Sequence, residues 1–432
     1  MRDLIVTALI LASVPFAIRQ PWIGVLSYLW VSVMNIQHFG YSFALTLPFA
    51  AIVAAATLVG MAVTKDKVGL PINGTTILLI VFPLWMCITY MFALENELDG
   101  YVRWKEVMKI FFFIVVSASI LKTRKHLEWM IWIIVISVGF YGIKGGLFTI
   151  ANGGSYRVWG PPGNSSISDN NSISVALVMM VPLMFYLRSI VSQKWLKLAL
   201  LGGIGLSTLS ILGSHSRGAF LAIVVMVLFL WLKSQKKLFL GILIVAVLPL
   251  AIGFMPAEWT ERMETIKTYD EDESAMGRIN AWKVAINIAN DRPLIGGGFE
   301  LYTPKTFAKY APNPLDIHSA HSIYFQMLGE HGYVGLILFL SIGFVGWLNG
   351  SRVIRLSRNN PEHKWAGDLA RMIQVSLVGF AVGGLFVNIG YWEIHYYLIL
   401  ALMVMYNIVK PPNAPAVFRR SVPPLAPVEN SS

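Results

Sequence analysis

Long apolar runs recur along the whole chain, and this pattern constrains the fold more than any other feature. A transmembrane helix needs about 20 predominantly apolar residues, and runs near that length repeat from the N-terminus to about residue 409. Only 13% of the 432 residues are charged and the mean hydropathy is +0.63, whereas soluble domains carry about a quarter charged residues. We therefore predict an all-α, polytopic integral membrane protein.

Short basic clusters separate the apolar runs, as the positive-inside rule predicts for cytoplasmic loops. The clusters lie at residues 65–67, 122–125, 188–197, 233–237, 351–358 and 410–420. If all are cytoplasmic, the intervening runs must occur in pairs, and this arrangement predicts about twelve spans. The first two runs flank Arg19 and Pro21 and could be two spans or a re-entrant pair. Topology thus explains the net charge of +11, with anionic membrane lipids rather than nucleic acid as a second partner.

The predicted spans divide the chain into four parts. Residues 1–254 form N-terminal transmembrane helices, and residues 255–320 form a long polar segment with short helices on the non-cytoplasmic side. Residues 321–409 form C-terminal transmembrane helices, and residues 410–432 form a cytoplasmic, proline-rich tail. The polar segment carries seven Lys or Arg and ten Asp or Glu, so it is mildly acidic.

The sequence lacks the motifs of nucleotide-dependent enzymes. It has no Walker motif and no Gly-rich dinucleotide fingerprint, so chemistry must proceed without ATP or NAD bound to this chain, and we predict no cofactor. The single cysteine, Cys87, lies in an apolar run and rules out an intrachain disulfide. The N-terminal apolar run is similar to a signal peptide, but the many later spans favour an uncleaved first membrane segment.

Several polar residues predicted to lie on the non-cytoplasmic side are candidates for function. Arg217 follows His215 in a tight turn between two apolar runs; it is either an interfacial anchor or a guanidinium aimed at phosphate. Arg278 and Trp282 share a helical pattern that ends near the glycine run Gly296–Gly298. Arg278 could equally be a solvated helix residue, and the glycines an ordinary turn.

Two further candidates lie in loops. Arg157 stands between Tyr156 and Trp159, where interfacial aromatic residues are common but could also stack on a sugar. His318 and His321 could share a helical face as metal ligands, yet no cysteine is near, so we predict no metal site. His331 lies deeper in the apolar run and is interpreted as a buried structural residue. His321 immediately precedes the span, where an imidazole of near-neutral pKa suits proton abstraction.

Three of these segments resemble the motifs of the O-antigen ligase and polymerase superfamily. HSIYFQMLGEHGYVG resembles the family's signature at a late span, although the family more often has Asn at the position of Ser322. SHSRGAF is similar to its Ser-Arg-Gly-Ala element. GRINAWKVAINIANDRPLIGGGF resembles its Arg-x3-Trp element followed by Pro-Leu-x-Gly-x-Gly. The resemblance covers roughly residues 150–400, and the N-terminal part is similar to the exosortase-associated O-glycosylation ligase subgroup.

The resemblance implies a metal-independent, inverting glycosyltransferase of GT-C type in the inner membrane, with its large loop and active site facing the periplasm. The implied donor is an undecaprenyl-pyrophosphate-linked glycan, and the acceptor of a ligase is lipid A-core. A polymerase would use the growing chain and an O-glycosylation relative a protein hydroxyl. On this basis His321 is the general base and Arg217 and Arg278 stabilise the diphosphate. Arg157, His318, Trp282, Gly296 and Gly298 are the expected substrate contacts.

A transporter or flippase for a lipid-linked or anionic solute is the alternative from another class. Arginines lining a cavity would serve it equally well, but it has no need for a base beside a large outer segment. Transporters also often contain internal repeats, and none is evident by eye. Release of free undecaprenyl pyrophosphate would distinguish an enzyme from a transporter.

Overall fold

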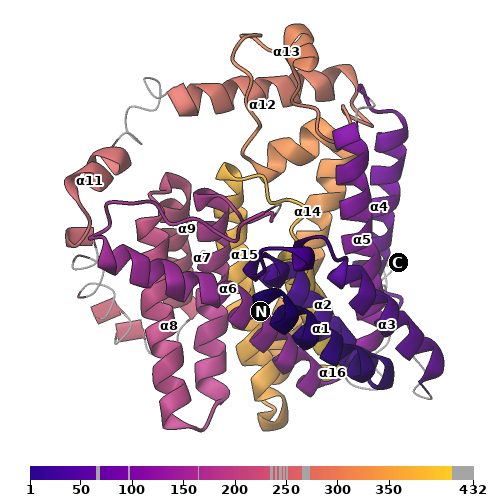
Figure 1. Ribbon diagram of the computed structural model, residues 1–432, viewed down its shortest axis with the longest axis vertical. Coiled ribbons are helices and arrows are strands. Elements are labelled where there is room, and N and C mark those ends of the chain that lie inside the picture. Colours follow the sequence, from indigo (N-terminus) through magenta and orange to yellow (C-terminus); the bar gives the residue numbers. More distant parts are fainter. Residues whose placement is uncertain are drawn as a thin grey trace, which may run out of the picture.

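The protein is an all-helical bundle in a computed structural model (Figure 1). The structure describes residues 1–64, 69–95, 98–163, 165–233, 237–238, 241–242, 246, 249, 252–264 and 273–410. The α-helices are α1 (Arg2–Arg19), α2 (Pro21–Met34), α3 (Phe49–Val63), α4 (Gly74–Met91), α5 (Leu98–Ile120), α6 (Arg124–Ala151), α7 (Asn170–Ile190), α8 (Lys194–Gly213), α9 (Arg217–Lys233), α11 (Ala257–Glu264), α12 (Glu273–Asp291), α13 (Pro304–Tyr310), α14 (Ile323–Ser357), α15 (Lys364–Gly383) and α16 (Glu393–Val409). Short 3-10 helices are η1 (Ile36–Phe39), η2 (Phe43–Leu45), η3 (Pro361–His363) and η4 (Gly384–Phe386).

The core is formed by helices whose residues are apolar on all sides. In α7, 78% of the most apolar window is buried, and α16 buries every residue from Glu393 to Met405. Helix α15 packs against α7, α9 and α14. A helix that is apolar all round is stable only inside a protein or a membrane, so α7 and α16 occupy the interior.

Helices at the periphery expose apolar side chains, as a membrane environment requires. Only 33% of the apolar window of α4 is buried, and the same is true of α14. Leu84 of α4 and Phe344 of α14 are 58% and 63% exposed. Large exposed apolar surfaces are rare on monomeric soluble proteins, so the outer surface of the bundle is suited to lipid.

Six helices in the described part of the chain are long and apolar enough to cross a membrane: α4, α6, α7, α8, α14 and a stretch from Pro361 to Phe386 that contains α15. Helices α2, α3 and α16 are apolar but shorter. The prediction of a helical membrane protein is confirmed. The count of about twelve spans stays a prediction, as does the GT-C topology. The basic cluster at 65–67 and most of the tail at 410–432 lie outside the described residues, as does about half of the apolar run at residues 238–254.

The N-terminal helices form a compact unit in which α1, α2 and α3 pack against one another. Pro21 begins α2, where a missing N–H is tolerated, so α1 and α2 are separate helices. The carboxylate of Asp3 accepts hydrogen bonds from the backbone N–H groups of Ser42 (2.9 Å) and Ala44 (3.2 Å). These bonds tie the start of α1 to the connection between α2 and α3.

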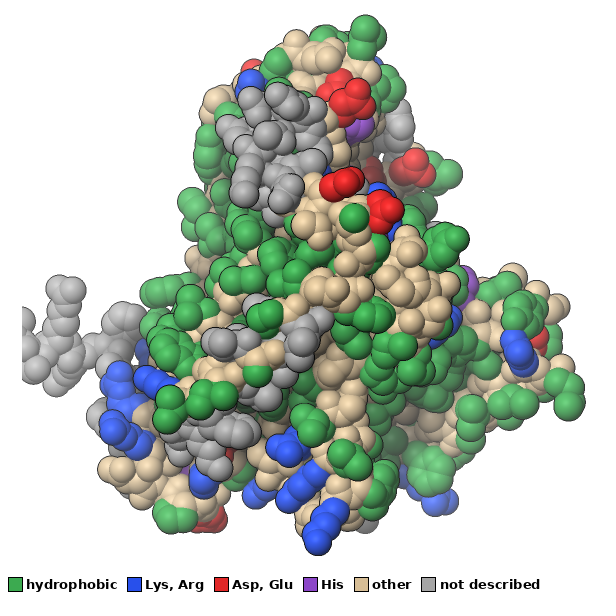
Figure 2. Space-filling model, turned by 90° about the vertical axis from the view of Figure 1, so that its left-hand side faces the viewer, with side chains coloured by type: hydrophobic (Ala, Val, Ile, Leu, Met, Phe, Trp, Pro, Cys, Tyr) green, Lys and Arg blue, Asp and Glu red, His purple; other side chains and the backbone are tan. Residues whose placement is uncertain are grey.

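Helices α12 and α13 lie across one end of the bundle, at the top of Figure 1. Figure 2 shows Lys and Arg side chains gathered most densely at the opposite end, while Asp and Glu side chains are prominent near α12 and α13. Helix α12 contains the predicted helical segment around Trp282. The charge separation along the bundle matches the alternation of basic clusters and polar segments in the sequence.

Candidate functional site

His321 lies in the non-helical stretch between α13 and α14, two residues before α14 begins. Its backbone has φ +43°, a left-handed value that is uncommon outside glycine but enriched in histidine. The backbone N–H of the next residue, Ser322, donates to Oδ1 of Asn388 (3.0 Å). Because residues 311–322 are not helical, the premise that His318 and His321 share a helical face is wrong. Long-range contacts hold His321 in place.

Ionisable groups from three segments act electrostatically on the His321 imidazole. Burial lowers the pKa of its imidazole below the usual 6.5, and the Arg278 guanidinium lowers it further. The Asp169 carboxylate raises this pKa, and His318 lowers it by a smaller amount. Arg278 and His318, both expected site residues, therefore lie close enough to His321 to affect its pKa. Asp169, at the N-terminus of α7, also does so and was not among the expected residues.

His318 packs against Gly277 in α12, the helix that also carries Arg278. A Cβ atom added at Gly277 would lie 2.1 Å from Cδ2 of His318, so glycine allows the ring to approach the backbone of α12. The Nε2 atom of His318 lies 3.2 Å from Oδ1 of Asp316. Among the described residues, no group of three or more His, Cys, Asp or Glu side chains is arranged to hold a metal ion.

Trp282 connects α12 to the segment that contains His321. Its indole N–H donates to the carbonyl oxygen of Ala320 (2.7 Å), and its ring stacks on Phe325 with centroids 4.8 Å apart. The half-buried indole thus contacts the chain on both sides of His321. The contacts of Trp282 are thus made within the protein, next to His321, whereas the sequence predicted a contact with substrate.

The turn that contains Arg217 is joined to the N-terminus of α7. The side chain of Asn170 donates to the carbonyl oxygen of Ser214 (2.8 Å), while the neighbouring Asp169 caps α7 by accepting from the N–H groups of Asn171 and Ser172. His215 has φ +57° and its Nε2 lies 2.7 Å from the carbonyl oxygen of Gly154. The polar start of α7 therefore connects the Arg217 turn with the surroundings of His321.

Helix η4 forms a second connection between the two motifs. A Cβ atom at Gly218 would lie 2.5 Å from Cβ of Phe386, and one at Gly384 would lie 2.3 Å from Cδ1 of Ile323. Arg217 begins α9 and Ile323 begins α14, so η4 packs against both helix starts. The two predicted motif segments are thus brought to the same end of the bundle.

Arg157 lies in the loop between α6 and α7, and its side chain is exposed. Tyr156 and Trp159 beside it are also exposed. The N–H of Val158 donates to the carbonyl oxygen of Gly213 (3.0 Å), which places this loop along the end of α8, next to the Arg217 turn. Arg157 is therefore at the rim of the candidate site, with its guanidinium accessible.

The glycine run has a structural partner in α14. This helix is broken at Gly332, whose φ of 67° and ψ of −171° are not helical. The N–H groups of Gly297 and Gly298 donate to the carbonyl oxygens of Gly329 (2.7 Å) and Glu330 (2.9 Å). The Pro-Leu-x-Gly-x-Gly segment is therefore hydrogen-bonded to α14 just before its break at Gly332.

The backbone donors of the run are engaged within the protein, because the N–H of Gly296 also donates to the carbonyl oxygen of Arg292. The N–H groups of Gly296 and Gly298, both expected substrate contacts, are thus bonded within the protein and give a substrate no spare backbone donor. We leave both glycines out of the proposed site.

His331 is fully buried and takes part in a network that joins three segments. Its Nδ1 lies 2.7 Å from the Thr89 hydroxyl and its Nε2 lies 2.5 Å from the Tyr391 hydroxyl. Tyr391 also donates to the carboxylate of Glu330. The interpretation of His331 as a buried residue with a structural role agrees with these contacts.

An apolar groove begins next to His321. Its volume is about 240 Å³, and its lining starts at Ile323 and Tyr324 and extends to Trp347 in α14, with side chains of α15 and α16. A Cβ atom at Gly343, which lines the groove, would meet nothing within 4 Å. The groove can accommodate an apolar chain whose polar end lies near His321.

Two residues near the site were missed by sequence reasoning. Asp169 stands in the run Asp-Asn-Asn-Ser before an apolar stretch, which is a recognisable N-cap signal but does not indicate contact with His321. Asn388 is a polar residue between apolar neighbours, a pattern that marks it as a candidate for function. The sequence does not indicate which residues Asp169 and Asn388 contact, because those contacts depend on the fold.

Comparison with known proteins supports the class defined by these features. The apolar helices and the polar site at one end define a multi-pass α-helical membrane protein. Residues 202–340 match the family described as O-Antigen ligase, and residues 1–192 match a family of unknown function (DUF5935). A search of curated proteins finds no match.

Residues 202–340 of the chain thus form a domain of the O-antigen ligase family, as the motifs predicted. The matched region includes Arg217, Arg278 and His321. The family implies a glycosyltransferase-like enzyme with a ligase or polymerase type of function in O-antigen biosynthesis. Its partners are, in general terms, a lipid-linked glycan and a lipid acceptor, and the chain is a multi-pass bacterial membrane protein.

Proposed function

We propose that the chain is an O-antigen ligase. It transfers a glycan from undecaprenyl pyrophosphate to lipid A-core at the periplasmic face of the inner membrane. The observation that carries the proposal is the convergence of His321 and Arg278 at the same end of the bundle as the Arg217 turn. The donor is activated before it reaches this site, which accounts for a reaction without a bound nucleotide or other cofactor.

His321 acts as the general base in this proposal. It accepts the proton of the acceptor hydroxyl as the oxygen attacks the anomeric carbon, and the bond from that carbon to the pyrophosphate oxygen breaks with inversion. Burial and the Arg278 charge lower the imidazole pKa, so the ring is neutral and able to accept a proton at neutral pH. A positioned base contributes about 10² to 10⁴-fold to the rate.

Arg217 and Arg278 stabilise the leaving diphosphate. A guanidinium is always charged and matches phosphate oxygens with two donors, so negative charge on the departing pyrophosphate is neutralised without a metal ion. Exposed Arg157, Tyr156 and Trp159 are available to contact the glycan, and His318 lies beside the same site. The groove that begins at Ile323 is suited to the polyprenyl chain.

The test is a transfer assay with full-length purified protein, undecaprenyl-pyrophosphate-linked glycan and lipid A-core. We expect His321→Ala and Arg278→Gln to abolish both glycan transfer and release of undecaprenyl pyrophosphate. The matched controls are His363→Ala and Arg352→Gln, which lie at the opposite end of the bundle. Full transfer by His321→Ala would remove the base from the mechanism.

The acceptor is tested separately. Replacing lipid A-core with a second lipid-linked glycan should stop the reaction of a ligase. Chain elongation in that mixture would instead identify a polymerase, and modification of a hydroxyl-bearing peptide would identify a protein O-oligosaccharyltransferase. Movement of the lipid-linked glycan across the membrane of a vesicle, without release of undecaprenyl pyrophosphate, would identify a transporter.

A further inference from the structure

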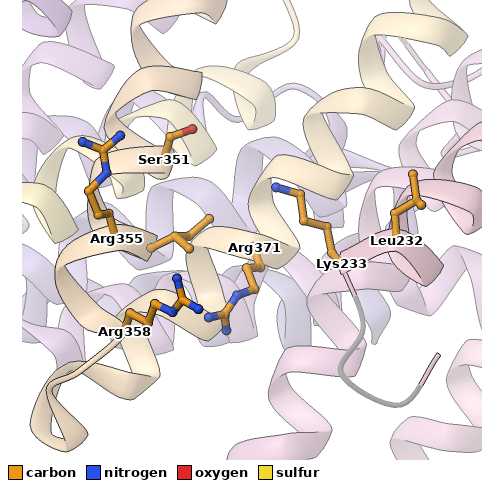
Figure 3. A pocket seen from close by; sticks show the side chains of 7 residues that line it. Leu232, Lys233, Ser351, Arg355, Arg358 and Arg371 are labelled. Carbon is orange, nitrogen blue, oxygen red and sulfur yellow. The ribbon is translucent and has the colours of Figure 1, made fainter.

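A second cavity lies far from the candidate site, among the ends of α9 and α14 and the first half of α15 (Figure 3). Its volume is about 760 Å³. None of the described residues that line it is acidic. Four of the lining side chains are cationic: Lys233, Arg355, Arg358 and Arg371. Such a concentration of like charge in one cavity favours an anionic ligand.

The cavity and the candidate site lie at opposite ends of the bundle. Arg217 is the first residue of α9 and Lys233 is the last, and a helix of 17 residues spans about 25 Å. The cavity is therefore separate from the groups that surround His321. It lies at the end of the molecule where basic side chains gather (Figure 2).

The wall of the cavity is held by a buried polar network. Gln374 is fully buried, and its Nε2 donates to the Ser351 hydroxyl (3.0 Å) and to the carbonyl oxygen of Trp347 (3.1 Å). The ammonium group of Lys233 donates to Oε1 of Gln374 (3.2 Å). Since Lys233 and Ser351 both line the cavity, their positions are set before any ligand binds.

The three arginine side chains of the cavity differ in how far the protein neutralises them. Arg371 forms an ion pair with Asp368 (2.6 Å), but within the described part of the chain Arg355 and Arg358 have no acidic partner within ion-pair distance. Figure 3 shows the guanidinium groups of Arg358 and Arg371 pointing toward each other. A phosphate between or beside them would relieve this repulsion and accept several charge-assisted hydrogen bonds.

The surroundings of the cavity indicate that the anion is part of a lipid. The lining includes the apolar residues Leu232 and Ile354, of which Leu232 is 48% exposed, and the Lys233 ammonium lies 5.7 Å from the centre of the Trp347 ring. Apolar side chains, tryptophan and basic residues together are typical of the membrane–water interface. A free inorganic anion would gain nothing from the apolar side chains.

We propose that this cavity binds the phosphate headgroup of an anionic membrane lipid. Arg355, Arg358 and Arg371 contact the phosphate. Lys233 of α9 and Ser351 of α14 lie beside the headgroup. The acyl chains lie along the apolar lining residues Leu232 and Ile354. This assignment does not depend on the activity proposed for His321.

The test uses full-length protein in neutral detergent, titrated with short-chain phosphatidylglycerol, short-chain phosphatidylcholine or inorganic phosphate. The readout is the thermal unfolding midpoint, because a ligand that binds the folded state raises it in a concentration-dependent way. The test variant is Arg355→Gln with Arg358→Gln. The matched control is Arg188→Gln with Lys194→Gln, which removes the same charge from exposed positions near other helix ends.

We expect phosphatidylglycerol to raise the midpoint of the wild type and of the control, and phosphatidylcholine to have no such effect. In the Arg355→Gln, Arg358→Gln variant the apparent affinity for phosphatidylglycerol should fall at least about tenfold, since each cation near an anionic lipid contributes about 1 kcal/mol. A variant that responds like the wild type would overturn the site. An equal midpoint shift with inorganic phosphate would overturn the assignment to lipid.

Discussion

The indole N–H of Trp282 donates to the carbonyl oxygen of Ala320 at 2.7 Å, directly before His321 in the chain. This bond joins α12 to a stretch that has no helical hydrogen bonds of its own. We expect Trp282→Phe to keep the ring stacking on Phe325 while losing the hydrogen bond. Activity should fall on the order of tenfold in kcat with little change in KM, because a base held less firmly is misplaced at the reacting hydroxyl.

The control for Trp282 is Trp231→Phe, which removes a similar indole bond to the carbonyl oxygen of Lys237 (2.9 Å) at the other end of the molecule. Steady-state transfer rates measured across substrate concentrations separate kcat from KM. If Trp282→Phe and Trp231→Phe behave alike, Trp282 has no positioning role.

The pH profile of transfer should report the environment of His321. Its pKa is lowered, first by burial and then by Arg278, so the acid limb of kcat/KM should lie below the 6.5 of an unperturbed imidazole. The Asp169 carboxylate raises the pKa of His321. Asp169→Asn removes that effect, so the neutral base persists to lower pH and the limb should move in the acidic direction.

Asparagine is a good N-cap residue, so Asp169→Asn preserves the cap of α7. Glu362→Gln, an exposed change at the far end of the bundle, should leave the profile unchanged. A limb that moves to higher pH in Asp169→Asn would contradict the assignment of the base.

The broken turn in α14 should not tolerate a side chain at Gly332. Its backbone angles belong to a region that only glycine adopts readily, and an added Cβ would lie 2.5 Å from the carbonyl oxygen of Leu294. We expect Gly332→Ala to cost about 3 kcal/mol of unfolding free energy. Gly205→Ala is the control, because a Cβ there meets nothing within 4 Å; thermal unfolding should show no loss for it.

The polar network around His331 should contribute to the stability of the fold. His331→Leu removes a partner of the Thr89 and Tyr391 hydroxyls, and a buried polar group left unsatisfied costs about 1–3 kcal/mol. The unfolding midpoint should therefore fall clearly, whereas His363→Leu at the far end should have little effect. A stable but inactive His331→Leu protein would point instead to a direct role in catalysis.

Filling the groove beside His321 should interfere with a long lipid chain. Gly343→Leu places a side chain in the open space along α14, while Gly205→Leu adds the same bulk to an exposed position of α8. If the groove holds the polyprenyl chain, Gly343→Leu should raise the KM for a long-chain donor at least several-fold and affect a short-chain donor less. Equal effects on both donors would contradict this use of the groove.

Much of the candidate site was accessible from local patterns. Arg217, Arg278 and His321 each stand at a boundary between polar and apolar segments, and the structure brings them to one end of the bundle. The substrate role expected of the glycine run was a weaker inference. Its amides are used by the broken turn of α14, and a run of glycines does not reveal whether its N–H groups will meet a ligand or the protein's own backbone.

The apolar runs in the sequence were enough to predict an all-helical membrane protein, because backbone polar groups in lipid can be satisfied in few other ways. The short polar segments that interrupt those runs were equally evident. Three features follow from the folded chain alone: the bond from Trp282 to Ala320, the effect of Asp169 on His321, and the four cations that line one cavity. These contacts join segments far apart in the chain, and their geometry follows from helix packing rather than from any local pattern.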